Sequence, residues 1–144
     1  MKSHARVVVI GGGVVGVSTL YHLAKKGWDD VVLVERKELT SGSTWHAAGL
    51  LPLFNMSYSV GQIHKYSVQC YQELEKETHM NVGFRNVSNI RLASNQDRMD
   101  EYRQYAGVAS TIGVEVDFLS PEQVLDYWPM CNVDGLVGAI RHPQ

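Results

Sequence analysis

The sequence predicts an α/β protein that opens with a β-α-β unit and continues into a region of mixed helices and strands. Two short apolar runs, at residues 6–10 and 31–34, flank a stretch with helical periodicity. Nearly continuous apolar runs of this length are typical of parallel strands that are buried on both faces. A glycine-rich turn joins the first run to the helical stretch, which indicates a Rossmann-like unit with a right-handed crossover.

The first helix is expected from Val14 to about Lys26. Apolar side chains recur within it at helical spacing, and Gly27 is a residue type that readily ends a helix. After the second strand we expect a long loop over residues 37–53, instead of an immediate second helix.

The second helix is expected from about Ser59 to His79. Ser59 and Gln62 have the spacing of a capping box, and Gly83 lies beyond the helix end. The apolar residues predicted to share the buried face are Val60, Ile63, Cys70, Tyr71 and Leu74.

The pattern changes more often after residue 83, which favours an α+β arrangement. The elements expected there are one or two strands within 84–93, a helix at 95–112, a strand at 114–118, a helix that begins at residue 120 and ends before 128, and a strand at 136–140. The alternation within 114–118 is typical of a half-exposed strand. Ser120, Pro121 and Gln123 together form a strong helix start with a capping box.

The chain stops directly after the last expected strand, which we interpret as parallel. A parallel strand at that place would have no following helix to cover it. We therefore expect a truncated fragment of a larger protein, cut inside a domain. The alternative is a complete small domain whose last strand lies at a sheet edge.

Composition excludes several classes of partner. The chain has 144 residues and a formal net charge of −2, which does not favour binding to nucleic acid or to an anionic membrane. No apolar run approaches the roughly 18 residues needed to span a bilayer. Since no signal segment precedes the first strand, we expect a cytoplasmic protein. Cys70 and Cys131 lie far apart, so a structural zinc is not expected and a disulfide is unsupported.

Residues 11–16, GGGVVG, have the spacing of a dinucleotide-binding fingerprint between a strand and a helix. Gly11 allows the tight turn, Gly13 allows a pyrophosphate to approach the backbone, and Gly16 allows the helix to pack on the strand. Glu35 ends the second strand, 19 residues after Gly16, where a carboxylate can accept hydrogen bonds from ribose hydroxyls. A carboxylate there disfavours the 2′-phosphate of NADP but does not separate NAD from FAD.

The loop after Glu35 favours a flavin. In the common NAD arrangement a helix and a third strand follow promptly, whereas this chain continues with 41-SGSTWHAAG-49. The small residues of this stretch allow backbone N–H groups to come close to a phosphate or a flavin ring. Trp45 provides either a flat wall for a ligand or a side chain for core packing under the loop.

Several stretches together resemble a known family. The runs 5-ARVVVIGGGVVGVSTLYHLAKKG-27, 34-VER-36 and 38-ELTSGSTWHAAGL-50 look like the N-terminal part of dimethylglycine and sarcosine dehydrogenases, which are D-amino-acid-oxidase-like FAD oxidoreductases. The later stretches 73-ELEKET-78, 88-SNIRLAS-94 and 119-LSPEQV-124 are also similar. The resemblance therefore covers nearly the whole chain, and the STWHAAG motif is its most specific part.

The resemblance implies that an imidazole nitrogen of His46 is bonded covalently to the 8α carbon of FAD. A neutral imidazole is a good nucleophile, and an unperturbed histidine is mostly neutral at pH 7. With the fingerprint, the predicted cofactor-binding residues are Gly11, Gly13, Val14, Val15, Gly16, Glu35, Arg36, Gly42, Ser43, Thr44, Trp45, His46, Ala47, Ala48, Gly49 and Leu50. No catalytic or metal-binding residue is assigned, and Arg85 and Arg91 are interpreted as surface charges.

The resemblance also implies a reaction: oxidation of the CH–NH group of an N-methylated amino acid such as dimethylglycine or sarcosine, with hydride transfer to the flavin. The electron acceptor would be oxygen or an electron-transfer flavoprotein, and tetrahydrofolate could bind in a C-terminal module beyond Gln144. Alternatives are a noncovalent FAD amino-acid oxidase-like protein, a catalytically idle regulatory relative, and a plain NAD-binding module. The expected division is 1–80 for the first part of the FAD-binding domain, 81–135 for the start of an interleaved α+β substrate domain, and 136–144 for a further strand.

Overall fold

The computed structural model of the protein describes residues 3–143. Contacts divide the chain into two compact units, Met1–Leu50 and Leu51–Gln144. The domain division expected at residues 80 and 135 stays a prediction. Among the described residues, no helix has both the length and the apolar character needed to cross a membrane.

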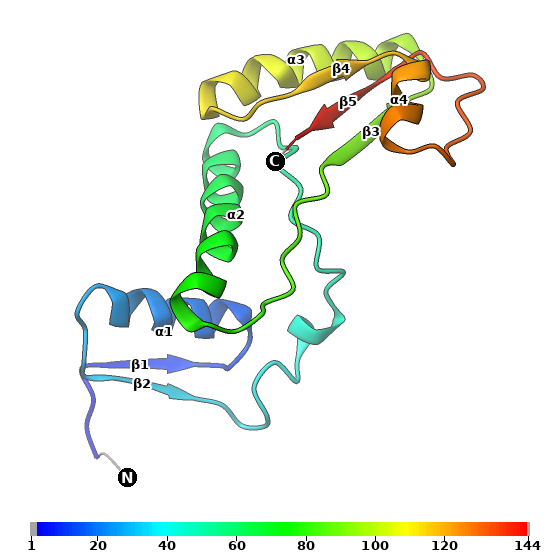
Figure 1. Ribbon diagram of the computed structural model, residues 1–144. Coiled ribbons are helices and arrows are strands. Elements are labelled where there is room, and N and C mark those ends of the chain that lie inside the picture. Colours follow the sequence, from blue (N-terminus) through cyan, green and yellow to red (C-terminus); the bar gives the residue numbers. More distant parts are fainter. Residues whose placement is uncertain (1–2, 144) are drawn as a thin grey trace. The chain divides into compact units, whose positions relative to one another are not determined.

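The first unit is the predicted β-α-β arrangement (Figure 1). Strand β1, Val7–Ile10, leads through the glycine turn into helix α1, Val14–Lys25, and the chain returns as strand β2, Val31–Val34. The two strands pair in parallel, with Val7 opposite Val31 and Ile10 opposite Val34. The parallel pairing and the helix between the strands confirm the predicted fold class.

The prediction that both strands are buried on both faces is wrong. Helix α1 packs on one face of the pair, where Val7 and Val9 are half-buried. On the other face Val8 is 52% exposed and Ile10 is 87% exposed. The physical reason is that the sheet of this unit has two strands and a single covering helix.

In the second unit, helix α2, Tyr58–Thr78, begins one residue earlier than predicted. The N-cap is Ser57, whose hydroxyl accepts from the Val60 N–H, so the expected capping box at Ser59 is wrong. The predicted buried face is also wrong in part, since Ile63 is 63% exposed while Gly61 and Val68 are buried. A Cβ at Gly61 would come within 2.3 Å of Ile112 Cδ1, so close helix packing at a glycine sets which face is inward.

The second unit contains an antiparallel sheet of three strands in the order β3-β5-β4. These strands are β3, Asn89–Ala93, β4, Asp117–Leu119, and β5, Gly138–His142. The expectation that the last strand is parallel is wrong, because β5 pairs antiparallel with β3 and β4. It lies in the centre of this sheet, so the alternative of an edge strand is wrong as well.

Three predicted strands are shorter or shifted, and the last of them, expected at 136–140, is β5 at Gly138–His142. Residues 84–88 are irregular, and only 89–93 form β3. The strand expected at 114–118 is observed at 117–119, because Val114, just beyond the C-cap Gly113, is hydrogen-bonded back to the last turn of α3. Its N–H donates to the Ala109 carbonyl at 2.9 Å, and its side chain is buried.

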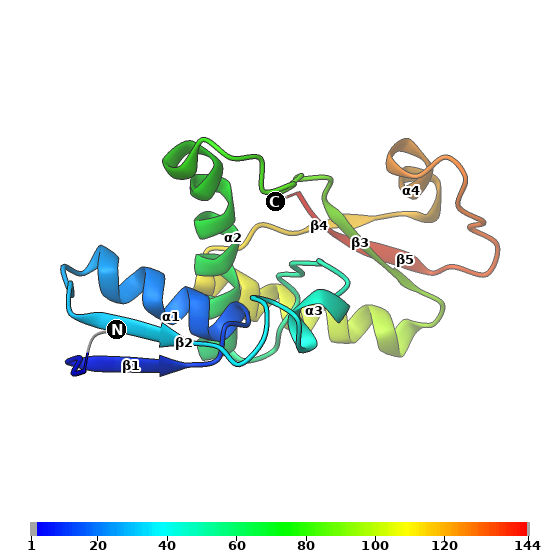
Figure 2. The same cartoon turned by 90° about the horizontal axis from the view of Figure 1, so that it is seen from below.

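Two helices cover opposite faces of this sheet. Helix α3, Gln96–Ile112, packs against Ile140, and helix α4, Pro121–Tyr127, packs with Ala139. Neighbouring residues of a strand point to opposite faces, so the two helices lie on opposite sides of β5. Figures 1 and 2 show α3 running along the sheet. The predicted capping box of α4 is confirmed, with Ser120 and Gln123 bonded reciprocally.

Candidate functional site

The glycine turn after β1 has the backbone geometry that the fingerprint requires. Gly11 has φ +105°, a conformation that L side chains rarely adopt. A Cβ at Gly16 would lie 1.9 Å from the Gly11 carbonyl oxygen, so no larger residue fits there. The close approach brings α1 onto β1 and directs its N-terminus to the turn.

The carboxylate of Glu35 is held by the same turn. Its Oε2 accepts from the Gly12 N–H at 2.6 Å, and its Oε1 accepts from the Lys37 N–H at 2.9 Å. These hydrogen bonds lower the pKa of Glu35 below its ordinary value, and the bond from Gly12 has the largest effect. An ionised carboxylate has about four acceptor positions, so capacity for ribose hydroxyls remains.

Gly12 is a residue of this site that sequence reasoning missed. It is buried, and a Cβ there would lie 2.6 Å from Leu39 Cδ2 and 3.1 Å from Glu35 Cβ. Its carbonyl accepts from the Thr40 N–H at 2.9 Å, which brings the start of the loop back to the turn. The run of three glycines was the available signal, since the fingerprint itself requires only the first and third.

Thr44 joins the STWHAAG loop to the N-terminus of α1. Its Oγ1 accepts from the Val14 N–H at 2.9 Å, although 30 positions separate the two residues. Thr44 lies in the short 3₁₀ helix η1, Ser43–His46. First-turn N–H groups have no acceptor within their own helix, so those of Val15 and Gly16 are directed outward, as anion binding at a helix terminus requires.

The same short helix presents Trp45 and His46 side by side. Their ring centroids are 4.0 Å apart, with an angle of 35° between the planes. Both side chains are exposed, and Trp45 is 66% exposed. The alternative that Trp45 packs in a core under the loop is therefore wrong for the described residues.

The remaining predicted residues lie within the first unit and are largely exposed. Val15 and Leu50 are each 77% exposed, and Arg36 is exposed after the end of β2. Gly42, Ser43, Ala47, Ala48 and Gly49 are exposed along the loop. The arrangement combines a helix N-terminus, a carboxylate held by the turn and an exposed apolar and aromatic surface, and these features fit the phosphates, ribose and ring of FAD.

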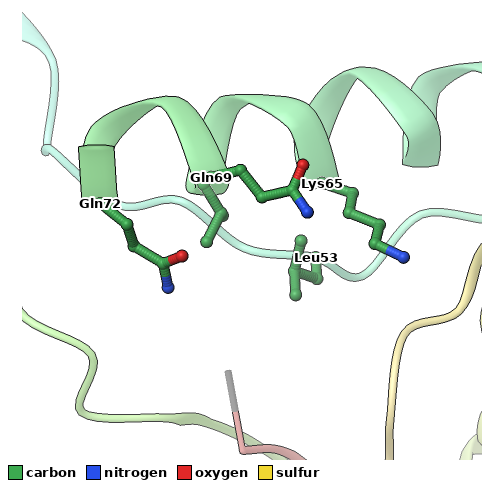
Figure 3. Close-up of a pocket in the computed structure, with 5 residues that line it drawn as sticks. Leu53, Lys65, Gln69 and Gln72 are labelled. Atoms are coloured by element: carbon green, nitrogen blue, oxygen red, sulfur yellow. The ribbon is translucent and has the colours of Figure 1, made fainter. Parts of the chain in front are cut away.

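A pocket in the second unit is lined by none of the predicted cofactor residues. In the second unit a pocket of about 280 Å³ lies between α2 and the segment that precedes it (Figure 3). It is lined by Leu53, Lys65, Val68, Gln69 and Gln72. Within residues 3–143, no group of three or more His, Cys, Asp or Glu side chains is arranged to hold a metal ion.

Comparisons with known proteins find curated relatives that match this chain along its whole length. Dimethylglycine dehydrogenase, mitochondrial, of Rattus norvegicus is 42% identical over 99% of this chain. Sarcosine dehydrogenase, mitochondrial, of Mus musculus is 41% identical over the whole chain. The pyruvate dehydrogenase phosphatase regulatory subunit, mitochondrial, of Mus musculus is 36% identical over the whole chain. The chain spans 16% to 17% of the length of these curated relatives.

A solved structure and a family model also match this chain. The crystal structure of L-proline dehydrogenase from P. horikoshii superposes with a TM-score of 0.91 over 99% of this chain and 37% of its own, at 22% identity, which shows a common fold. Residues 6–144 match the family described as DAO, FAD dependent oxidoreductase. The match covers more than half of the chain, and the glycine turn, Glu35 and the loop all lie within it. The chain belongs to the DAO family of FAD dependent oxidoreductases.

Proposed function

We propose that the protein oxidises the CH–NH group of an N-methylated amino acid, such as dimethylglycine or sarcosine, and that it holds FAD covalently through His46. The observation that supports this most is the hydrogen bond from Val14 to Thr44. This bond fixes Thr44 at the N-terminus of α1, and Trp45 and His46 are the two residues that follow Thr44 in the chain. The two relatives named dimethylglycine and sarcosine dehydrogenase support the substrate class.

The residues of the first unit have separate roles in this proposal. The glycine turn and the first turn of α1 bind the pyrophosphate through backbone N–H groups. Glu35 binds ribose hydroxyls, and its low pKa keeps it ionised and able only to accept. His46 forms the bond that tethers the cofactor, and Trp45 offers an exposed ring beside it. When bound, FAD supplies the chemistry that accepts a hydride from the substrate carbon.

Two alternatives keep the same fold and site. In the first, FAD is held without a covalent bond and His46 lies close to it. In the second, the protein is a regulatory relative without turnover, an option favoured by the 36% identity to the pyruvate dehydrogenase phosphatase regulatory subunit. The STWHAAG motif argues against the second option, because an idle protein has little need of a covalent anchor.

The remaining features of the function stay predictions. The electron acceptor would be oxygen or an electron-transfer flavoprotein, and tetrahydrofolate would bind outside this chain. The compartment predicted from the sequence is the cytoplasm, whereas the curated relatives cited above carry the word mitochondrial in their names.

A substrate panel tests the proposed activity. The full-length flavoprotein is assayed with dimethylglycine, sarcosine, glycine betaine and proline, with an electron-accepting dye as the readout. We expect turnover with one or both of the two N-methyl amines that carry a free nitrogen lone pair, and none with the quaternary betaine. Bound flavin without turnover of any of the four compounds would favour the regulatory alternative, and turnover of proline alone would overturn the substrate class.

A further inference from the structure

The two aromatic side chains of the short helix η1 contact each other within the first unit. The ring centroids of Trp45 and His46 lie 4.0 Å apart and the ring planes differ by 35°, so one face of the imidazole lies against the indole. A 3₁₀ helix has about three residues per turn, so consecutive side chains leave its axis about 120° apart. Adjacency in the chain does not by itself bring two such rings together, and the contact needs both side chains to turn toward each other.

Hydrogen bonds hold the backbone on both sides of this pair. The Val14 N–H donates to Thr44 Oγ1 at 2.9 Å, and the Ala47 N–H donates to the Thr44 carbonyl at 3.2 Å. A Cβ at Gly13 would lie 3.1 Å from the same Oγ1, so Thr44 lies close against the glycine turn. Since Thr44 and Ala47 flank the pair, both rings extend from a backbone that is held within the first unit.

The imidazole of His46 has this ring contact as its side-chain interaction in the part of the chain that the structure describes. Within residues 3–143, neither of its nitrogens takes part in a hydrogen bond or an ion pair. By contrast, His22 Nδ1 lies 2.7 Å from the Ser18 carbonyl oxygen. Both nitrogens of His46 are therefore available for chemistry.

Stacking and hydrogen bonding have different consequences for a nucleophilic imidazole. In the neutral ring one nitrogen carries a proton, and the other has a lone pair in the plane of the ring. A hydrogen bond to the second nitrogen would occupy that lone pair, whereas an aromatic ring against the face leaves it free. Contact with Trp45 therefore limits the rotation of the His46 side chain and still leaves its nucleophilic nitrogen exposed.

We propose that Trp45 is a positioning residue for the attachment of FAD: by stacking on the imidazole it holds His46 in few orientations and speeds the formation of the bond to the 8α carbon. The inference rests on the proposed function, since it assumes that His46 and FAD become bonded. A nucleophile held near its reactive orientation reacts faster than one that rotates freely.

The attachment forms one bond and breaks two. An imidazole nitrogen of His46 bonds to the 8α carbon, while one C–H bond of that methyl group and the imidazole N–H bond are broken. Both hydrogens leave as protons. Two electrons go to the flavin ring and then to an electron acceptor such as oxygen, which with two protons becomes hydrogen peroxide. Trp45 takes no part in these bonds, and its ring affects only the orientation of His46.

The test follows attachment in the full-length protein, prepared without flavin and then mixed with FAD at several concentrations. Acid precipitation at successive times gives the rate at which flavin becomes acid-stable, and hence a maximal rate and a half-saturating FAD concentration. For Trp45→Leu we expect a maximal rate about fivefold lower than in the wild type, which corresponds to about 1 kcal/mol, the size of an aromatic contact. Trp45→Phe keeps a flat ring and should stay within about twofold of the wild-type rate.

Trp128 provides the matched control. It is 49% exposed, compared with 66% for Trp45, and it makes no ring contact within residues 3–143. Trp128→Leu removes the same groups from an exposed position and should attach flavin at the wild-type rate. Since Trp45 is mostly exposed, Trp45→Leu should leave thermal unfolding unchanged.

The outcomes separate this inference from the proposed function. Acid-stable flavin that forms equally fast in the wild type and in Trp45→Leu would overturn the positioning role while the covalent tether stands. A higher half-saturating FAD concentration with an unchanged maximal rate would also overturn it, because Trp45 would then act only as a wall for the flavin. A maximal rate as low in Trp45→Phe or Trp128→Leu as in Trp45→Leu would count against the stacked ring. If the wild type forms no acid-stable flavin, the covalent tether itself fails, and the inference fails with it.

Discussion

The absence of a side chain at Gly16 allows α1 to pack closely against the glycine turn of the first unit. The carbonyl of Gly11 occupies the place where a Cβ would be, at 1.9 Å. The Gly11 oxygen belongs to the backbone of the turn, and a Cβ at Gly16 would be attached directly to the backbone of α1. Neither could move without displacing the turn or the helix. The N-terminus of α1 carries the hydrogen bond to Thr44, and a shift there would also move the loop.

Gly16→Ala should therefore abolish FAD binding and lower the free energy of unfolding by about 3 kcal/mol, at the upper end for an overpacked site. The measurement is flavin content together with thermal unfolding. Gly107→Ala is the control, because a Cβ at this exposed position of α3 would meet nothing within 4 Å. That control should be stabilised by about 1 kcal/mol, the helix propensity gained. Normal flavin content in Gly16→Ala would show that this close approach does not position the helix.

At the scale of elements, β5 and α3 meet at a buried histidine. Burial and the Arg91 charge lower the pKa of His142 from 6.5 to about 4, and burial raises the pKa of Tyr105 to about 12. In the unfolded chain His142 binds a proton near pH 6.5, whereas the folded protein binds it only near pH 4. Between these values the unfolded state binds more protons, so acidification favours unfolding.

We expect the contribution of His142 to the free energy of unfolding to be fully present above pH 6.5. It should decrease by about 3 kcal/mol as the pH is lowered to 4, since one pKa unit corresponds to about 1.4 kcal/mol. Denaturant unfolding at several pH values measures this slope. His142→Gln should show a flat profile between pH 6.5 and 4.5, the part of this range in which the lowered carboxylates stay ionised in both states. The carboxylates with lowered pKa, Glu35, Asp100 and Glu122, lose their contribution only below about pH 4.5. An equal slope in wild type and His142→Gln would contradict the assignment.

Elements with local signals were predictable, and those fixed by distant contacts were not. The capping box of Ser120 and the left-handed Gly113 act within a few residues, so α4 and the end of α3 followed from sequence. The direction of β5 depends on which strands it pairs with, and periodicity does not carry that information. Val114 alternates like a strand residue, but its hydrogen bond to Ala109 assigns it to the helix end.

The candidate site shows the same division. The glycine spacing and Glu35 were readable because each residue has one geometric role in the turn. The bond between Thr44 and Val14 joins residues 30 positions apart, and no local pattern predicts it. His142 belongs to no sequence motif, and it is buried against Tyr105 because β5 is a central strand.

At the scale of the whole molecule, family membership extends over residues 6–144, while the chain spans 17% of the length of the rat relative. All the predicted cofactor residues fall in the first unit, before Leu51. The cofactor proposal can therefore be tested at His46 whatever the rest of the protein contributes to the substrate site.

The most direct test of the central claim is where the flavin goes when the protein is denatured. The full-length protein is precipitated in acid and washed, and its absorbance is compared with that of His46→Ala and of His4→Ala, a control at another exposed histidine. We expect the yellow colour to stay with the wild type and with His4→Ala, and to be absent from the His46→Ala precipitate. Release of free flavin from the wild type would contradict the covalent tether at His46.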